Sequence, residues 1–178
     1  LYNSYIRAIK WAGDRLGDGG GIVAFVSGSA WLERQFADGM RACLYDQYTE
    51  INVINLRGDI RKNMLSKGLA GEGENVFGSG SMTGISIALL VRNPRKRDSC
   101  NLYYHDIGQN LTAKDKLLAL QKAVGMRGIR REFGMQKIIP NEKFDWLQQR
   151  DAEFDGLVPL GDRSGGNEIR IFADLSLG

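Results

Sequence analysis

The chain has 178 residues, of which 43% are apolar and 25% are charged, and its formal net charge is +3. This composition is typical of a globular protein with one core of ordinary size, and so weak a net charge does not by itself indicate nucleic-acid binding. The longest apolar run, residues 85–91, is too short to cross a bilayer, and the sequence shows no signal peptide. We therefore expect a soluble cytoplasmic protein that does not bind membranes.

Cysteine and histidine content restricts the chemistry further. Cys43 and Cys100 are far apart and His105 is the one histidine, so the sequence does not supply the ligands of an ordinary zinc site. Two lone cysteines fit buried thiols in a reducing compartment better than a disulfide framework. The chain opens at Leu1 without an initiator methionine and stops after a strand-like run, so we expect a segment of a longer protein.

Helix and strand patterns alternate along the first part of the chain. Apolar residues at three- and four-residue spacing predict a helix over residues 2–16, and a short apolar run predicts a buried parallel strand over 22–26. A helix over about 30–48, with Ser29 as its N-cap, and a strand over 51–56 follow. Strand, helix and strand in this order predict the βαβ unit of an α/β fold.

The regular pattern then lapses over residues 57–76, and a loop this long inside a compact domain is usually functional or mobile. A strand over 85–91 follows with no helix before it, so we expect it to pair antiparallel with residues 51–56. Residues 101–105 predict a further strand.

The second half of the chain has a mixed α+β character. A sequence resembling a capping box predicts a helix over residues 112–124, a short helix is expected at 144–147, and residues 157–178 are typical of strands and turns. Because the character of the sequence changes near residues 94–110, we divide the chain into domains 1–93 and 94–178.

Several familiar catalytic motifs are missing. The glycine-rich residues 78–84 lead into a strand, whereas a dinucleotide-binding turn leads into a helix, and no Gly-Lys-Ser/Thr phosphate loop exists. His105-Asp106 has no nucleophile elbow to serve and is interpreted as a strand-end pair. Trp11, Trp31 and Trp146 are interpreted as packing residues. The chain is therefore not expected to be a self-contained catalyst.

Phe77 is the most informative residue of the sequence. It precedes a glycine-serine turn and an apolar strand, and it fits two interpretations: a core residue that anchors a loop, or an exposed face on which a nucleobase extracted from a duplex stacks. Two basic groups fit either phosphate binding or solvated turns. They are Arg92, Arg95, Lys96 and Arg97, and Arg127, Arg130 and Arg131.

An ordered set of phrases carries a resemblance to a known family. The phrases are residues 2–12 (YNSYIRAIKWA), 21–26 (GIVAFV), 38–41 (DGMR), 55–59 (NLRGD), 76–81 (VFGSGS), 104–108 (YHDIG) and 145–151 (DWLQQRD). In this order they resemble the methyltransferase region of Type ISP restriction–modification enzymes, over residues 2–178. These enzymes are single large polypeptides that join nuclease, helicase-like translocase, adenine methyltransferase and target-recognition parts.

The resemblance implies N6-adenine methylation of double-stranded DNA with S-adenosylmethionine, on a Rossmann-like methyltransferase sheet whose last strand runs antiparallel. Residues 1–93 would be the later half of that catalytic domain, and residues 94–178 a connector and the start of the target-recognition region. The family's glycine-rich cofactor turn and its Asn-Pro-Pro-Tyr/Trp motif are absent here and lie upstream in the family, so this segment alone is expected to be inactive. ATP and Mg²⁺ would bind only to other domains of the same polypeptide.

The resemblance also assigns roles to residues. Related adenine methyltransferases place an aromatic residue before the final antiparallel strand, where it stacks on the flipped adenine, and Phe77 occupies that position. Ser27, Gly28 and Ser29 follow a sheet strand and would form a pocket wall. The cations expected to contact DNA phosphates are Arg57, Arg61, Lys62, Lys67, Arg95, Lys96 and Arg97.

Two other classes of function compete with the methyltransferase. A DNA-binding or coupling module, which links a translocase to target recognition without methyl transfer, predicts a buried Phe77 and an affinity governed by salt. A purely structural interaction domain is favoured if neither basic group lies near Phe77. The methyltransferase hypothesis instead expects Phe77 at a loop tip, on the same sheet edge as residues 27–29.

Overall fold

The computed structural model describes the chain except residues 1–2, 97–98, 124, 148–156, 159–170 and 172–178. It divides into two compact units, Leu1–Leu147 and Gln148–Gly178. The helices and strands described below lie in the first unit. Among the described residues, no helix combines the length and the apolar character that crossing a membrane requires.

The elements follow one another as α1 (Ser4–Leu16), η1 (Gly17–Gly19), β1 (Gly21–Gly28), η2 (Ser29–Leu32), η3 (Gln35–Ala37), α2 (Asp38–Gln47), β2 (Glu50–Arg57), α3 (Ile60–Leu65), η4 (Gly78–Gly80), β3 (Ile85–Arg92), β4 (Asn101–Asp106), α4 (Ala113–Gln121), α5 (Gly125–Phe133) and β5 (Gln136–Ile138). The η elements are short 3₁₀ turns. The fold is therefore α/β.

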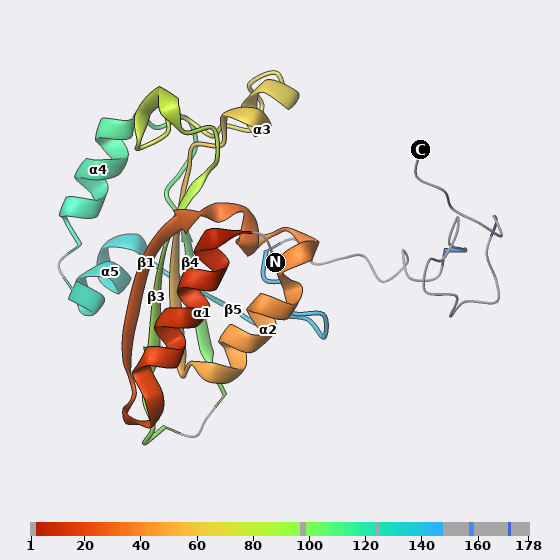
Figure 1. The fold of residues 1–178 in the computed structure, drawn as a ribbon. Helices are drawn as coiled ribbons and strands as arrows, with labels where there is room; N and C mark the ends of the chain where they lie inside the picture. The colour runs from red at the N-terminus through yellow and green to blue at the C-terminus, as the bar shows by residue number, and fades with distance from the viewer. Residues whose placement is uncertain (1–2, 97–98, 124, 148–156, 159–170, 172–178) are drawn as a thin grey trace. The chain divides into compact units, whose positions relative to one another are not determined.

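The described strands form one mixed sheet in the order β1-β3-β2-β4-β5 (Figure 1). β3 runs antiparallel to both β1 and β2, and β2 runs parallel to β4. The predicted antiparallel pairing of residues 51–56 with 85–91 is confirmed, with Ile54 opposite Ile87. β1 and β2 point the same way, as the predicted βαβ unit requires, but β3 lies between them.

Helices cover both faces of the sheet. α1 and α2 lie against one face (Figure 1), over a main core whose strand residues alternate along β1, β3, β2 and β4. That core includes Ile9, Val23, Trp31, Leu44, Ile51, Val53, Leu90 and Leu102. On the other face, a smaller core brings Ile54, Leu56 and Ile85 against Phe133 of α5. Each buried side chain of this size contributes about 1.5–3 kcal/mol.

An ionic group lies inside the main core. The side chain of Arg41 is fully buried, and its Nη2 donates to Asp145 Oδ1 at 3.0 Å. Its Nε donates to the carbonyl oxygen of Phe144 at 2.6 Å, and its Nη1 donates to the carbonyl oxygens of Trp31 and Arg34 at 2.9 and 2.8 Å. A buried charge is tolerated only when it is paired and hydrogen-bonded. Arg41 therefore fastens residues 144–145 to α2 and to the turns before it.

The predicted helix over residues 30–48 is wrong at its start. Residues 29–37 form the turns η2 and η3, and α2 begins only at Asp38. The carbonyl oxygens of Trp31 and Arg34 face the Arg41 guanidinium, which holds this stretch away from a continuous helix. Ser29 opens η2 without a side-chain capping bond, and the N-cap residue is Gly28.

The helix predicted at residues 144–147 is also wrong. Asn141 Oδ1 accepts from the backbone N–H groups of Lys143 and Asp145, and Phe144 has a φ of 54°, which together give a turn. α3, α5 and β5 are elements that the sequence pattern did not predict. Cys43 is exposed rather than buried.

Among the tryptophans, Trp31 and Trp146 are buried as expected, whereas Trp11 is 62% exposed. β4 and β5 join the same sheet as β1, β2 and β3. The sheet therefore continues across the predicted domain boundary between residues 93 and 94. That boundary stays a prediction. The strand-and-turn prediction for residues 157–178 falls almost entirely outside the described residues.

Candidate nucleic-acid interface

One edge of the sheet gathers the ends of several strands. β1 ends there at Gly28, β2 at Arg57 and β4 at Asp106, and β3 starts there at Ile85. The long connection between β2 and β3, which contains α3, projects from this edge (Figure 1). Ligands of open α/β sheets bind outside the carboxyl ends of parallel strands. This edge is therefore the first place to look for a site.

Phe77 lies on an anchored turn at this edge. Its side chain is 65% exposed, whereas that of Asn75, two residues earlier, is 4% exposed. Asn75 Nδ2 donates to the carbonyl oxygens of Gly58 at 3.0 Å and Thr83 at 2.8 Å, and its Oδ1 accepts from the Phe77 N–H at 3.0 Å. Asn75 thus fixes the turn that presents Phe77 to the surface.

Ser27, Gly28 and Ser29 lie at the same edge and contact the Phe77 connection. The backbone N–H of Ser29 donates to the Gly84 carbonyl oxygen at 2.7 Å. A Cβ at Gly84 would lie 2.5 Å from Ser29 Oγ, so a larger residue there would require the Ser29 side chain to move. Ser27 is buried, and its hydroxyl donates to the Gly28 carbonyl oxygen at 3.3 Å. The structure therefore brings Phe77 and residues 27–29 to one edge, as the methyltransferase hypothesis expects.

Arg57 is engaged within the protein. Its Nε donates to Asp106 Oδ1 at 2.7 Å and its Nη1 to the Ala70 carbonyl oxygen at 3.0 Å. Burial acts to raise the pKa of Asp106, but the hydrogen bonds from Arg57 and from the Gly108 N–H outweigh it and lower that pKa. The pair is completed by Tyr104, whose hydroxyl lies 3.4 Å from Asp106 Oδ2 and whose pKa burial raises to about 12.

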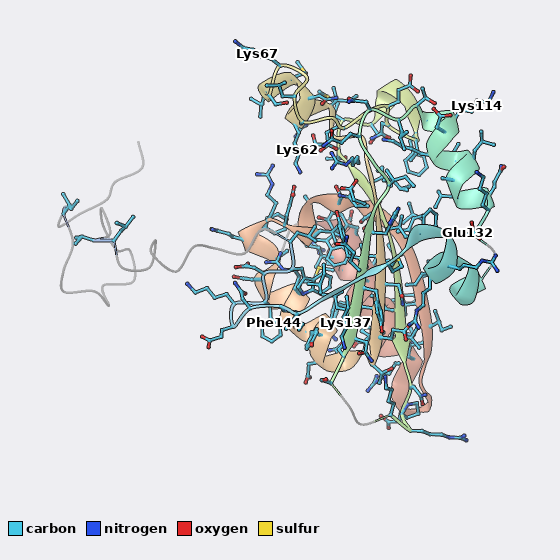
Figure 2. The ribbon with its side chains drawn as sticks, turned by 180° about the vertical axis from the view of Figure 1, so that it is seen from behind. Lys62, Lys67, Lys114, Glu132, Lys137 and Phe144 are labelled. Atoms are coloured by element: carbon cyan, nitrogen blue, oxygen red, sulfur yellow. The ribbon has the colours of Figure 1, made fainter. Side chains whose placement is uncertain are left out.

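The other cations of the connection between β2 and β3 differ in ion pairing and exposure. Lys62 forms an ion pair with Glu33, whereas Arg61 and Lys67 are exposed. Figure 2 shows Lys67 at the outer end of the α3 segment, with Lys62 on the side nearer the sheet. Within the part of the chain that the structure describes, neither Arg61 nor Lys67 has an ion-pair partner.

Sequence reasoning missed two polar residues that support this site. Lys116 of α4 is fully buried, and its Nζ donates to the carbonyl oxygens of Glu72 at 3.0 Å and Glu74 at 2.7 Å. Burial lowers the pKa of Lys116. Asn75 was the second residue missed. The signal that favoured it was local, because an asparagine two residues before a turn residue often bonds that residue's N–H.

The remaining predicted cations lie elsewhere. Arg95 and Lys96 follow the far end of β3, about 23 Å from its first residue at about 3.3 Å per residue. There Arg92 and Lys96 line a pocket of about 570 Å³. Arg97 lies outside the described residues. Arg130 pairs with Glu50 and stacks over the Tyr103 ring at 4.6 Å.

No family model and no curated protein matches this chain. Solved structures do match it. The ATP-dependent Type ISP restriction–modification enzyme LlaBIII bound to DNA gives a TM-score of 0.82 at 37% identity, over 93% of this chain and 11% of that chain. A nuclease-deletion mutant of the Type ISP enzyme LlaGI, in complex with a DNA substrate mimic, gives 0.73 at 36% identity, over 92% and 15%. A DrdV–DNA complex gives 0.76 at 28% identity, over 97% and 17%.

The fold and these identities relate the chain to restriction–modification enzymes. More particularly, it is related over nearly its whole length to one segment of the Type ISP enzymes, so the predicted resemblance to these enzymes is confirmed. The chain spans only 11% to 17% of the length of the three matched chains.

Proposed function

We propose that this chain is part of a DNA adenine-N6 methyltransferase within a larger ATP-dependent restriction–modification protein. The related LlaBIII and LlaGI structures contain DNA or a DNA substrate mimic, which supports double-stranded DNA and other domains of the same polypeptide as partners. We interpret the sheet as the later half of a Rossmann-like methyltransferase sheet. The antiparallel strand β3 between β1 and β2 supports this interpretation.

The observation that carries the proposal is the exposed Phe77 on a turn fixed by Asn75, at the same edge as residues 27–29. The rival coupling module predicts a buried Phe77, which the exposed side chain does not fit. The structural interaction domain is favoured when the basic groups lie away from Phe77, and Arg95, Lys96 and Arg130 do lie away from it, so the methyl-transfer test below decides between that rival and the proposal. In our proposal, Phe77 stacks on the extruded adenine. Stacking on one aromatic face contributes roughly 1–3 kcal/mol per base, which offsets much of the few kcal/mol that extrusion costs.

The cations divide into two roles in this proposal. Arg61 and Lys67 contact phosphates beside the target base, whereas Arg57 and Lys62 organise the connection through Asp106 and Glu33. Arg95, Lys96 and Arg97 contact a second stretch of the duplex.

The described residues do not by themselves fit S-adenosylmethionine. The Ser27 hydroxyl is directed to the Gly28 carbonyl oxygen, and the space at Ser29 is filled by Gly84, so this edge offers a wall rather than a cradle. When bound elsewhere in the polypeptide, the cofactor supplies the methyl group. ATP and Mg²⁺ are likewise assigned to other domains. This chain binds, orients and stacks the base, which is catalysis by positioning.

The proposal is tested by methyl transfer from labelled S-adenosylmethionine to DNA by the intact polypeptide. We expect Phe77→Ala to lower the rate about 5- to 150-fold, which corresponds to losing 1–3 kcal/mol of stacking. Phe77→Trp, which keeps a stacking face, should retain most of the rate. Normal methylation by a folded Phe77→Ala variant would make Phe77 structural. A wild-type protein that methylates no DNA would favour the coupling module.

A further inference from the structure

The α3 segment exposes large apolar side chains at its outer end. Met64, Leu65 and Leu69 are 68%, 88% and 89% exposed. Among the described residues, the two leucines are the most exposed large apolar side chains of the chain. Exposed apolar side chains that cluster in this way mark interaction sites rather than random surface.

The backbone that carries these side chains is ordered by its own hydrogen bonds. The Gly68 N–H donates to the Asn63 carbonyl oxygen at 2.7 Å, and the Leu69 N–H donates to the Ser66 carbonyl oxygen at 3.1 Å. The Ala70 N–H donates to Ser66 Oγ at 2.9 Å. Gly68 has a φ of 87°, a conformation that favours glycine. The leucines are therefore held at the surface by a formed turn.

The base of the segment is tied to the sheet edge. Arg57 Nη1 holds the Ala70 carbonyl oxygen at 3.0 Å, and Asn63 Oδ1 accepts from the Glu72 N–H at 3.2 Å. Asp59 caps α3 by accepting from the Lys62 N–H at 3.1 Å. The segment thus presents Leu65 and Leu69 from a fixed support on the edge that also carries Phe77.

The charges around the leucines fit a polyanion. The sequence between Asp59 and Glu72 contains no carboxylate side chain. It contains three cations, Arg61, Lys62 and Lys67. Arg61 and Lys67 are exposed. An apolar protein surface would bury these cations without partners, whereas a duplex offers phosphates to the cations and stacked base steps to the leucines. DNA-bending proteins insert leucine and methionine wedges between base steps in this way.

We infer that Leu65 and Leu69 form an apolar wedge that enters the DNA duplex beside the target base pair and lowers the cost of extruding the base. The inference rests on the proposed function, because Phe77 receives the base that the wedge helps to release. Arg61 and Lys67 hold the flanking phosphates while the wedge is inserted.

The test compares two kinds of DNA bound to the intact polypeptide. A 30-base-pair duplex selected by the wild-type protein from a random pool is compared with a series that carries one mismatched pair at each position in turn. We expect the Leu65→Ala/Leu69→Ala double variant to bind the paired duplex at least about tenfold more weakly. The loss of affinity caused by the double variant should be smaller when the mismatch lies at one particular position, because a mismatched base there is already partly released.

Two control variants separate the wedge from other effects. Ile139→Ala removes a side chain that is 76% exposed near the opposite end of the sheet, and it should leave both affinities unchanged. Arg61→Gln/Lys67→Gln should weaken binding to every duplex alike and reduce the slope of log affinity against log salt by about 0.9 for each phosphate that the variant no longer neutralises.

An equal loss of affinity on all duplexes, or no loss on any, would overturn the wedge. A leucine variant with normal affinity for every duplex but a lower unfolding midpoint would also overturn it, because the leucines would then pack against another part of the polypeptide. If the leucine variant binds DNA like the wild type while Phe77→Ala loses methyl transfer, the wedge is wrong and the methyltransferase proposal stands. If the leucine variant loses DNA affinity except at one mismatch position, but the wild-type protein methylates no DNA, the wedge stands and the methyltransferase proposal is wrong.

Discussion

Arg41 and Arg61 carry the same side chain in opposite settings. Arg41 is fully buried and has an acceptor at each of its three guanidinium nitrogens, whereas Arg61 is exposed on the segment that projects from the sheet edge. The first holds distant parts of the chain together, and the second is available to a ligand. Charge beneath α2 thus holds the fold together, whereas the charge of Arg61 beyond β2 is exposed at the surface.

The same contrast exists within the functional edge. Asn75 and Phe77 are two residues apart, yet one is 4% exposed and the other 65% exposed. The buried residue positions the exposed one. A substitution at Asn75 should therefore cost both stability and activity, while one at Phe77 should cost activity alone.

The largest effect is expected at Arg41. Arg41→Met removes the cation that pairs with the buried Asp145 carboxylate, and breaking a buried ion pair costs about 3–5 kcal/mol. Arg61→Met is the matched control and should change the free energy of unfolding by less than about 0.5 kcal/mol. Urea unfolding measures both. Equal midpoints for the two variants would contradict the division between buried and exposed charge.

A smaller effect is expected at Asn75. Asn75→Ala removes three hydrogen bonds and leaves the carbonyl oxygens of the buried Gly58 and of Thr83 without this donor. We expect a loss of about 1–3 kcal/mol, together with slower methyl transfer. Ser81→Ala, which removes only a weak 3.5 Å hydrogen bond to Thr83, is the control. An Asn75→Ala variant with normal stability and rate would show that the turn is held by other interactions.

The Arg57–Asp106 pair should make stability depend on pH. Because the folded pKa of Asp106 is lowered below 3.8, its contribution is present above that value and is lost as pH falls through the folded pKa. Asp106→Asn should cost about 1–2 kcal/mol at neutral pH and flatten the acid side of the profile. Unfolding midpoints at neutral and acidic pH measure this, and an unchanged acid profile would contradict it.

The smallest effect is expected at the far end of the sheet. Arg95→Gln/Lys96→Gln should lower the slope of log DNA affinity against log salt by about 0.9 for each phosphate left without its cation and leave base extrusion unchanged. Lys10→Gln, which removes a cation paired with Asp14 on α1, is the control. An unchanged slope would show that Arg95 and Lys96 do not contact DNA, so that binding is confined to the edge that carries Phe77.

The strands over residues 22–26, 51–56, 85–91 and 101–105 could be predicted because apolar runs are local signals, whereas β5 was not predicted. The prediction of a buried parallel strand at 22–26 was wrong, because β1 lies at the edge of the sheet, partly exposed and antiparallel to β3. The antiparallel placement of residues 85–91 was inferred because no crossover helix was predicted, and it holds although the short helix α3 lies between β2 and β3. Arg41 could not be read in this way, because its partner Asp145 is 104 residues away. The bonds of Arg41 to the carbonyl oxygens of Trp31 and Arg34 explain why the start of the predicted helix 30–48 was wrong. The turn held by Asn141 explains why the helix 144–147 was wrong.

In the candidate site, too, local features could be predicted from the sequence and long-range contacts could not. The family resemblance placed Phe77 before the final strand, and the structure confirms that the residue is exposed there. Asn75 has one local partner, the Phe77 N–H, but its other two lie 17 and 8 residues away, and Asp106 lies 49 residues from Arg57. Such long-range bonds leave no local pattern, so a cation that binds within the protein looked the same in the sequence as one available to DNA.

The measurement that tests the central claim most directly is photochemical cross-linking to the target base. The intact polypeptide is irradiated with a duplex that carries 5-iodouracil in place of the methylated adenine, and the linked peptide is identified by mass spectrometry. Base stacking at the sheet edge predicts a cross-link at Phe77 that disappears in Phe77→Ala. A cross-link at another aromatic residue, with Phe77 unmodified, would contradict the account.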